Sequence, residues 1–419
     1  VQSYWTHYIV DEFQDVSKLQ LEILKLIVAH PNNLTVIGDD DQTIYEWRGS
    51  CGDIILDFPL LYSNTKKIIL RTNYRCPEII SSAALKSIRY NKKRADKEMI
   101  APKQNGSLKL IPVSGNREAG IVIAKQIKQI LDDADEDYSV LDNVGILYHN
   151  HSQASFAIDY LLDLGIPVRA NTYSLVYNSF IVRHLLDCIQ MLFQPCNQQL
   201  VSNTLSKFVK YMKTSESRAI GKACGGFTEF YEYPHLTNGR IQDAFETFAV
   251  AKNLLDQDAP FSEIASVLLP QYQESYLDYL METTAIDRQE VNDILDYLTT
   301  QPEHITYAKF VDNISKSKSL LETYNTIGIG ATALTMHSAK GLEFDNVFII
   351  NDSSVYCPQQ NVIMGLMQRG DKEELKKYIE QERRLHYVAV TRTKENLVIT
   401  YPEDSPSPYL VEMDVIGKY

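Results

Sequence analysis

The stretch Tyr8-Ile9-Val10-Asp11-Glu12-Phe13-Gln14-Asp15 decides how the chain is interpreted. Its first part, Tyr8 to Val10, is a short apolar run with the length and β-branched content of a buried strand. The run ends abruptly at two adjacent carboxylates, Asp11 and Glu12. Ligands of open α/β sheets bind at the carboxyl ends of the strands. The stretch therefore predicts a strand that presents two acidic side chains to a ligand.

This strand-Asp-Glu pattern is that of a Walker B element. Asp11 can hold a magnesium ion through its water shell, because Mg2+ keeps most of its waters and needs only one or two carboxylates. Glu12 would then orient or deprotonate the water that attacks the γ-phosphate of a nucleotide. The alternative for so short a pattern is a strand followed by a solvated acidic turn, and the rest of the chain decides between the two.

Length and composition limit the classes of protein. The 419 residues suffice for roughly two or three domains, and no apolar run approaches the length of a membrane span. The six cysteines show no CxxC spacing, which favours a reduced, cytoplasmic protein without a zinc or iron-sulfur site. The formal net charge of -13 argues mildly against nucleic acid binding, although a basic groove can be local.

A second strand with a polar end follows the first. A helix is expected over 17–29, capped by Ser17, and a second buried strand over 34–37 leads into Gly-Asp-Asp-Asp-Gln at 38–42. Two such strands side by side form the ligand crevice of a doubly wound sheet. Gln42 carries a donor and an acceptor on one amide, so it can report whether a γ-phosphate is present.

An aromatic and basic segment comes next, with Tyr45, Trp47 and Arg48. An aromatic ring beside an arginine can stack on a base and touch a phosphate, and one such stack contributes on the order of 1 to 3 kcal/mol. The alternative is that Trp47 belongs to the core.

A third strand is predicted at 68–70, followed by Asn-Tyr-Arg-Cys-Pro at 73–77. The proline suits the first turn of a helix. Arg75 would precede that helix and reach the triphosphate, while Tyr74 offers a flat face for adenine. A surface salt bridge is the alternative for Arg75.

Three strings occur in a fixed order: Val-Asp-Glu-Phe-Gln-Asp at 10–15, Gly-Asp-Asp-Asp-Gln-Thr-Ile-Tyr-Glu-Trp-Arg-Gly at 38–49, and Asn-Tyr-Arg-Cys-Pro at 73–77. Together they resemble motifs II, III and IV of the UvrD/Rep/PcrA family of superfamily 1 helicases. The resemblance implies a RecA-like ATP-binding domain and a DNA contact for Tyr45, Trp47 and Arg48.

Strands expected at 108–113, 144–148 and 166–169 alternate with helices over 117–131 and 152–164. This alternation predicts a second parallel sheet with helices on its faces, and the resemblance makes it the second RecA-like domain. The family usually has Tyr-Arg after the strand at 144, whereas this chain has Tyr148-His149, so the DNA contact of that arginine is not expected here.

Helical patterns dominate residues 179–326, at 180–193, 200–212, 241–255, 261–269, 286–298 and 307–315. By its position, this block resembles the inserted subdomain called 2B in the family. Two interpretations stay open for this block: a purely structural insertion, or a binding site for repair or replication proteins.

Two further motifs follow the helical block. After a strand at 332–336, His-Ser-Ala-Lys-Gly-Leu-Glu-Phe at 337–344 resembles motif V and is followed by a strand at 346–350. The resemblance implies that Glu343 accepts hydrogen bonds from the ribose hydroxyls, and that Thr335, His337 and Lys340 couple the nucleotide to the DNA groove.

A helix over 381–393, followed by a strand at 397–401, resembles motif VI. By that resemblance Arg392 is a second arginine finger beside Arg75. Arg383 and Arg384 are interpreted as structural ion-pair residues of the same helix.

The expected fold is α/β, with two RecA-like P-loop NTPase domains, the first partial, and a mainly helical insertion in the second. The expected divisions are a partial first domain (1–77), the two parts of the second domain (78–178 and 327–402), the insertion (179–326) and a tail (403–419). The resemblance implies an ATP-dependent DNA helicase with ATP and Mg2+ as cofactors. It would move 3′ to 5′ on single-stranded DNA and open single-strand/duplex junctions.

No stretch matches GxxxxGKS or GxxxxGKT, the loop whose backbone and lysine hold the β- and γ-phosphates. The first strand begins almost at Val1, so we expect a fragment that binds ATP weakly and does not hydrolyse it alone. Two alternatives stay open: the motor part of an AddA- or RecB-like helicase-nuclease, and a non-catalytic DNA-binding scaffold that naturally lacks this loop.

Overall fold

The computed structural model describes residues 5–28, 33–50, 52–171, 175–193, 198–224, 239–284 and 286–417. The chain divides into two compact units. The first comprises Val1–Ala119, Gln129–His149 and Ala331–Tyr419, and the second comprises Gly120–Lys128 and Asn150–Gly330. No helix in the described ranges combines the length and the apolar character that crossing a membrane requires.

The first unit begins with a two-stranded parallel sheet. Strand β1 (Tyr8–Val10) pairs with β2 (Leu34–Val36), with Tyr8 opposite Leu34. Helix α1 (Lys18–Ile27) connects them and begins with a capping box, in which the Ser17 side chain accepts from the Gln20 amide and the Gln20 side chain accepts from the Ser17 amide. The predicted order of strand, helix and strand, and the Ser17 cap, are confirmed.

The expected burial of these two strands was wrong. Ile9 is 73% exposed and Ile37 is 47% exposed. One face of the small sheet packs on a cluster of Phe13, Leu21, Ile54 and Phe58, and no described residue covers Ile9 on the other face. Two strands alone cannot bury both faces of a sheet, whereas the apolar sequence had suggested that both were covered.

The strand predicted at 68–70 was also wrong. Residues 65–71 form neither strand nor helix, and Ile68 and Leu70 are 72% and 80% exposed. The backbone is instead tied by a single bridge, between Thr72 and Ile100. A three-residue apolar run forms a strand only beside a partner, and no described strand lies next to this run.

The larger sheet has six parallel strands. Five of them come from the first unit and lie in the order β3-β8-β7-β4-β6. Their bounds are β3 (Ser107–Pro112), β4 (Val144–Tyr148), β6 (Ala331–Thr335), β7 (Phe344–Ile349) and β8 (Thr393–Tyr401). Strand β4 is buried along its whole length, as expected of a central parallel strand. The prediction of an α/β protein with a parallel sheet is confirmed.

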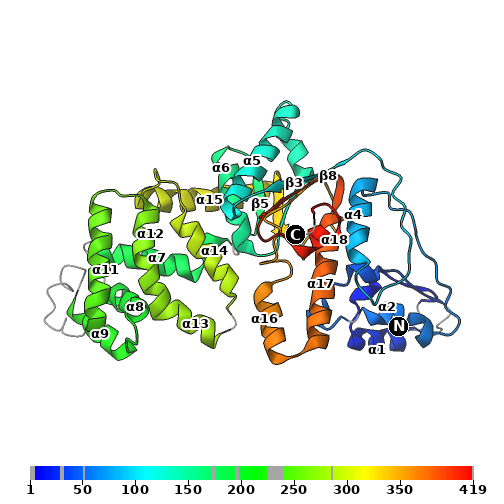
Figure 1. The fold of residues 1–419 in the computed structure, drawn as a ribbon, viewed down its shortest axis with the longest axis horizontal. Coiled ribbons are helices and arrows are strands. Elements are labelled where there is room, and N and C mark those ends of the chain that lie inside the picture. The colour runs from blue at the N-terminus through cyan, green and yellow to red at the C-terminus, as the bar shows by residue number, and fades with distance from the viewer. Residues whose placement is uncertain are drawn as a thin grey trace. The chain divides into compact units, whose positions relative to one another are not determined.

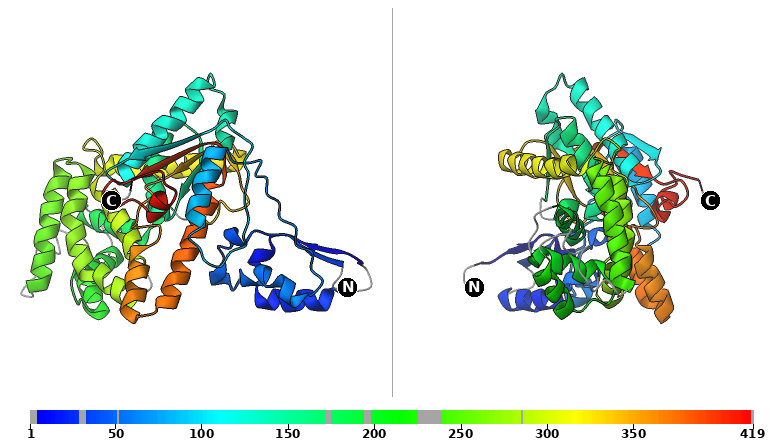
Figure 2. Two further views of the ribbon diagram at one scale, coloured as in Figure 1. Left: turned by 45° about the vertical axis from the view of Figure 1, so that its right-hand side comes forward. Right: turned by 90° about the vertical axis from the view of Figure 1, so that its left-hand side faces the viewer.

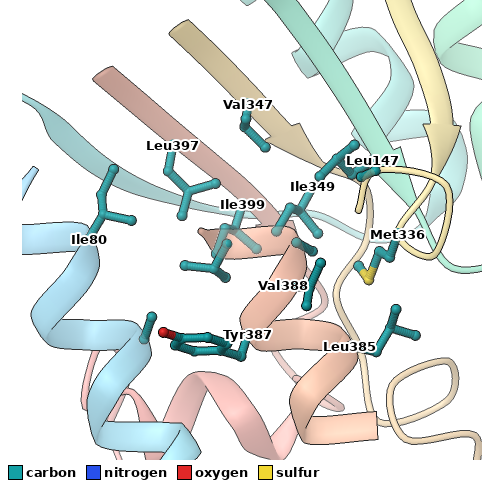
Figure 3. Packing of buried hydrophobic residues seen from close by; sticks show 14 of the residues in the cluster. Ile80, Leu147, Met336, Val347, Ile349, Leu385, Tyr387, Val388, Leu397 and Ile399 are labelled. Carbon is teal, nitrogen blue, oxygen red and sulfur yellow. The ribbon is translucent and has the colours of Figure 1, made fainter. Parts of the chain in front are cut away.

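Helices α4 (Glu78–Ile88) and α17 (Lys372–Val390) run side by side in both Figure 1 and Figure 2. Their apolar residues and those of the central strands form one core, which Figure 3 shows with Ile80, Val388 and Leu397. Helix α17 ends at Val390, three residues before the predicted end at Thr393. Arg392 therefore lies in the short turn between α17 and β8.

The other regular elements of the first unit are short, except for α5, which extends into the second unit. The helices are α2 (Asp53–Leu56), α3 (Phe58–Leu61), α5 (Asn116–Asp133), α16 (Gln360–Arg369) and α18 (Pro408–Glu412). The stretches of 3-10 helix are η1 (Phe13–Asp15), η3 (Asp40–Gln42), η4 (Glu46–Arg48) and η5 (Tyr138–Asn143).

The second unit is mainly helical, as predicted for most of it (Figure 1). Its α-helices are α6 (Ser155–Asp163), α7 (Phe180–Leu192), α8 (Gln198–Phe208), α9 (Thr214–Ala223), α11 (Gly239–Asp256), α12 (Phe261–Tyr272), α13 (Asp278–Thr283), α14 (Arg288–Thr299) and α15 (Tyr307–Ile327). The remaining elements are η6 (His151–Ala154), β5 (Val168–Ala170), η8 (Val176–Asn178) and the π-helical turn η9 (Gln273–Leu277).

A buried carboxyl group joins three elements of the second unit. Asp159 on α6 accepts hydrogen bonds from the hydroxyls of Tyr177 and Tyr297, the latter at 2.6 Å. Burial raises the pKa of Asp159 to about 7, against the opposing effect of the two hydroxyls. The folded chain therefore keeps a proton on Asp159 over a pH range in which the unfolded chain has lost it.

We expect the stability of the chain to fall as pH rises from about 4 to 7, by at most ~1.4 kcal/mol per pH unit from this one group. The variant Asp159→Asn stays neutral and should lose that part of the slope. Urea unfolding at several pH values in this range checks the prediction, with Asp163→Asn, an exposed carboxylate on the same helix, as the control. Equal slopes for Asp159→Asn and wild type would contradict it.

Candidate active site

The acidic pair lies where β1 ends. Asp11 Oδ1 accepts a hydrogen bond from the Glu12 backbone amide at 2.8 Å. Glu12 has φ 51° and ψ 38°, in the left-handed region of backbone conformation that residues other than glycine seldom adopt. Such a conformation costs on the order of 1 to 2 kcal/mol, and outliers of this kind concentrate at functional sites. The strained backbone therefore supports a functional role for Glu12.

Gln14 holds the Glu12 side chain in place. Its Nε2 donates to Glu12 Oε2 at 2.6 Å, and its Oε1 accepts from the Asp39 backbone amide at 3.1 Å. A Cβ atom on Gly38 would lie 2.3 Å from Gln14 Oε1, so only glycine leaves room for this amide. Sequence reasoning missed Gln14, and the only signal was its place two residues after Glu12.

Gln42 and Arg392 meet although 350 residues separate them in the sequence. Arg392 Nη2 donates to Gln42 Oε1 at 3.3 Å, and Gln42 Nε2 donates to Asp39 Oδ2 at 2.7 Å. Arg392 is 1% exposed, and its Nε also donates to the Val388 carbonyl at 2.9 Å. The turn between α17 and β8 thus brings a buried guanidinium to the amide of Gln42, the predicted sensor.

The charge of Arg392 is affected by its surroundings. Burial is the main cause that lowers the pKa of Arg392 to about 10, and repulsion from the neighbouring Arg75 is the second. The negative charge of Glu12 acts in the opposite direction. The residue stays protonated at neutral pH. A buried cation near a second cation is arranged to receive a strongly negative group, and a triphosphate is such a group.

Arg75 and Glu343 form an ion pair. Arg75 Nε donates to Glu343 Oε2 at 2.8 Å, and both side chains are partly exposed. The Asn73 side chain accepts from the Arg75 backbone amide at 2.9 Å and so fixes the turn before α4. Tyr74 is 79% exposed, which leaves its ring accessible to a base. Arg75, predicted to bind the triphosphate, therefore contacts Glu343, predicted to bind the ribose, and directly follows Tyr74, predicted to face adenine.

Lys340 lies beside the acidic pair. Its Nζ forms an ion pair with Asp15, donates to the Gln42 carbonyl at 2.8 Å and lies 3.8 Å from Glu12 Oε2. It also lies 5.2 Å from the centre of the Tyr45 ring. The side chain is 6% exposed. Lys340 thus links motif V to motifs II and III, and its predicted DNA contact stays a prediction.

The predicted DNA-binding segment contacts motif V. The Tyr45 hydroxyl donates to the His337 carbonyl at 3.2 Å, and Arg48 lies over the Tyr45 ring at 4.9 Å. The side chain of Trp47 lies outside the described residues. The contact to DNA predicted for these residues stays a prediction.

Polar contacts also surround His337 and Thr335. Thr335 Oγ1 lies 2.8 Å from the Ser338 hydroxyl, and burial lowers the pKa of His337. His149, which stands where the family has arginine, lies 3.0 Å from Glu382, with its Nε2 facing Glu382 Oε2. The position thus makes an internal polar contact with α17.

The residues at this site fit part of a nucleotide-magnesium complex. Asp11 is an exposed carboxylate at a strand end, and one carboxylate with water suffices to hold Mg2+, which would neutralise phosphate charge when bound. Gln42, Arg75 and Arg392 supply the donors that a γ-phosphate requires. The loop that would hold the β-phosphate is not in the sequence.

Two family models match the chain. The UvrD/REP helicase N-terminal domain matches residues 1–63, and the UvrD-like helicase C-terminal domain matches residues 289–404. The first match contains Asp11, Glu12 and Gln42, and the second contains Glu343 and Arg392. The residues that the structure brings together therefore come from both matched regions.

Curated relatives align with nearly the whole chain. An ATP-dependent DNA helicase PcrA from Staphylococcus epidermidis is 27% identical over 93% of this chain and 54% of its own length. Proteins named "Probable DNA helicase II homolog" from Mycoplasma capricolum and Rickettsia conorii are each 27% identical, over 98% and 96% of this chain and 58% and 61% of their own lengths. The chain thus spans little more than half the length of these relatives. Five ordered motifs, two family models and these relatives agree, and together they support a UvrD/Rep/PcrA-like superfamily 1 helicase.

Proposed function

We propose that this chain supplies most of the motor of an ATP-dependent DNA helicase, which couples ATP hydrolysis to 3′ to 5′ movement on single-stranded DNA and to unwinding of duplex DNA. One observation carries the proposal. The buried guanidinium of Arg392 contacts Gln42, whose loop also binds Gln14, the residue that holds Glu12. A candidate base, a sensor and a cation are thereby joined in one hydrogen-bonded chain.

Phosphoryl transfer depends on positioning and charge stabilisation more than on covalent chemistry. Asp11 would hold the magnesium ion, and Glu12 would orient the attacking water. Gln42 would contact the γ-phosphate, and Arg75 and Arg392 would neutralise the charge that develops on it. Arg75 must exchange its ion pair with Glu343 for the triphosphate, which leaves Glu343 free to accept from the ribose hydroxyls.

Coupling to DNA would run through motif V. Lys340 pairs with Asp15, lies 3.8 Å from Glu12 Oε2 and donates to the Gln42 carbonyl. A change at the γ-phosphate would therefore reach the segment that contains Thr335 and His337. The Tyr45 hydroxyl contacts the same segment from motif III. Single-stranded DNA held by Tyr45, Trp47 and Arg48 would then be displaced once per ATP. Partner proteins at residues 179–326 and a cytoplasmic location stay predictions.

The test is DNA-stimulated ATP hydrolysis by the complete gene product that contains these residues and a phosphate-binding loop. We expect hydrolysis that single-stranded DNA accelerates, and unwinding of duplexes with a 3′ tail but not with a 5′ tail. The 419 residues alone should bind ATP weakly and show no turnover, because the loop that holds the β- and γ-phosphates is missing from them.

Two results would contradict these expectations. DNA-stimulated hydrolysis by the 419 residues alone would show that the missing loop is dispensable. A complete gene product that has the loop and binds DNA, but hydrolyses no ATP, would point to a binding protein and not to a motor.

A further inference from the structure

A cluster of buried charges lies directly before the sensor residue. Three consecutive aspartates, Asp39, Asp40 and Asp41, surround the ammonium group of Lys97. Lys97 Nζ lies 2.9 Å from both Asp40 Oδ1 and Asp41 Oδ2, and it also forms an ion pair with Asp39. Arg94 donates to both oxygens of Asp41, at 2.7 and 3.0 Å. None of these contacts was expected from the sequence.

Most of the cluster is closed to solvent, whereas the Asp39 side chain is 30% exposed. The side chains of Lys97 and Asp41 are 11% and 1% exposed. Burial alone would raise the pKa of Asp39, but the charge of Lys97 and hydrogen bonds from Lys97 and Gln42 bring it below its ordinary value. Removing the ammonium would leave buried carboxylates without their counter-charge, which is far more costly than losing an exposed ion pair.

Asp39 connects the cluster to the sensor. Its Oδ2 accepts from Gln42 Nε2 at 2.7 Å, and its backbone carbonyl accepts from the Gln42 amide at 2.9 Å. Because Nε2 is held by Asp39, the other end of the amide, Oε1, faces Arg392. A flipped amide would present two N–H groups to a guanidinium, which has no acceptor. The position of Asp39 therefore decides which end of the Gln42 amide meets the arginine.

We propose that Lys97 is a positioning residue for the nucleotide sensor: it fixes Asp39, which in turn aligns the Gln42 amide with Arg392. Lys97 touches neither Gln42 nor Arg392 in this arrangement and acts through Asp39 alone. The inference rests on the proposed ATP hydrolysis for its kinetic consequence, but the alignment itself is a property of these 419 residues.

The kinetic test compares Lys97→Met with wild type in the complete gene product. We expect kcat for ATP hydrolysis to fall about 10-fold or more and KM for ATP to change less than about 3-fold, because a misaligned sensor loses transition-state contacts more than ground-state binding. Lys97→Arg, which keeps the charge, should recover part of kcat. The control is Lys86→Met on helix α4, which removes the lysine of an exposed ion pair with Asp414. It should behave as wild type.

A double variant separates positioning from charge balance. Lys97→Met combined with Asp40→Asn removes one positive and one negative charge. The Ala95 backbone amide donates a hydrogen bond to Asp40 Oδ2 at 2.7 Å, and the asparagine side chain can still accept it. Because Asp39 still lacks its lysine, we expect kcat to stay low. Recovery of wild-type kcat in the double variant would overturn the proposal, since Lys97 would then only balance charge.

A structural measurement keeps the two proposals distinguishable. In the 419-residue chain, Lys97→Met should speed amide hydrogen exchange at residues 38–46 by about 10-fold, with little change in the second unit. If the wild-type complete product does not hydrolyse ATP, the proposed function fails, and exchange alone decides the role of Lys97. Unchanged exchange at 38–46, or an unchanged kcat in Lys97→Met, would overturn the positioning role.

Discussion

Arg392→Lys should lower kcat for DNA-stimulated ATP hydrolysis by about 10³-fold, the lower end of what an arginine finger contributes. The guanidinium donates to four acceptors, namely the carbonyls of Val388 and Leu342, Gln42 Oε1 and Thr391 Oγ1. A lysine ammonium keeps the charge but cannot reproduce this planar fork. Binding of ATP should change far less than kcat, because the γ-phosphate charge grows only in the transition state.

The pH dependence of this variant gives a second measure. Arg392, with its pKa at about 10, stays charged up to about pH 9. A lysine at the same buried place starts from a lower ordinary pKa and feels the same burial and the same repulsion from Arg75. The kcat of Arg392→Lys should therefore fall as pH rises from 7 to 9, while that of wild type loses nothing through this residue.

The matched control is Arg384→Lys. Arg384 lies on the adjoining helix α17 and pairs with Glu46 at 3.1 Å, away from the Gln42 amide. The lysine keeps the positive charge beside Glu46, so Arg384→Lys should keep kcat within about 3-fold of wild type, although the Arg384 side chain is only 11% exposed. Wild-type kcat in Arg392→Lys at neutral pH would remove Arg392 from the catalytic group.

The sequence alone predicted the elements whose signals are local. The strand at Tyr8, the Ser17 cap and the alternation that forms the parallel sheet all follow from short-range patterns and were found in the structure. Which faces of these elements are covered depends on partners elsewhere in the chain. The exposed Ile9 and Leu70 show that apolar composition does not by itself identify what packs against a residue.

The candidate site depends on contacts that local patterns cannot predict. The pairs Gln42 with Arg392 and Arg75 with Glu343 join residues 350 and 268 positions apart. The ordered motifs identified these four residues through the family resemblance, but they did not predict which of the four contact each other. Lys97 gave no signal, because a single lysine in a charged segment is usually solvated, and only the fold places it among three aspartates.

Glu12→Gln should lower ATP turnover by about 10² to 10⁴-fold in the complete gene product, the range expected for loss of a general base. The glutamine has nearly the same shape and can still accept from Gln14 Nε2, which donates to Glu12 Oε2 at 2.6 Å. The left-handed backbone at φ 51° does not depend on the carboxylate, so the geometry of the site should persist. The variant loses the negative charge that orients the attacking water and accepts its proton.

Nucleotide binding separates this loss from a general collapse of the site. Asp11 would still hold magnesium, and Arg75 and Arg392 would still bind the triphosphate, so the Kd for ATP should stay within about 3-fold of wild type. Glu22→Gln, which removes an exposed carboxylate on α1 paired with Lys25, is the matched control and should hydrolyse ATP normally. Unchanged hydrolysis in Glu12→Gln would mean that another group activates the water. The candidate base would then be Asp15, whose pKa is raised by burial, against the opposing effect of Lys340.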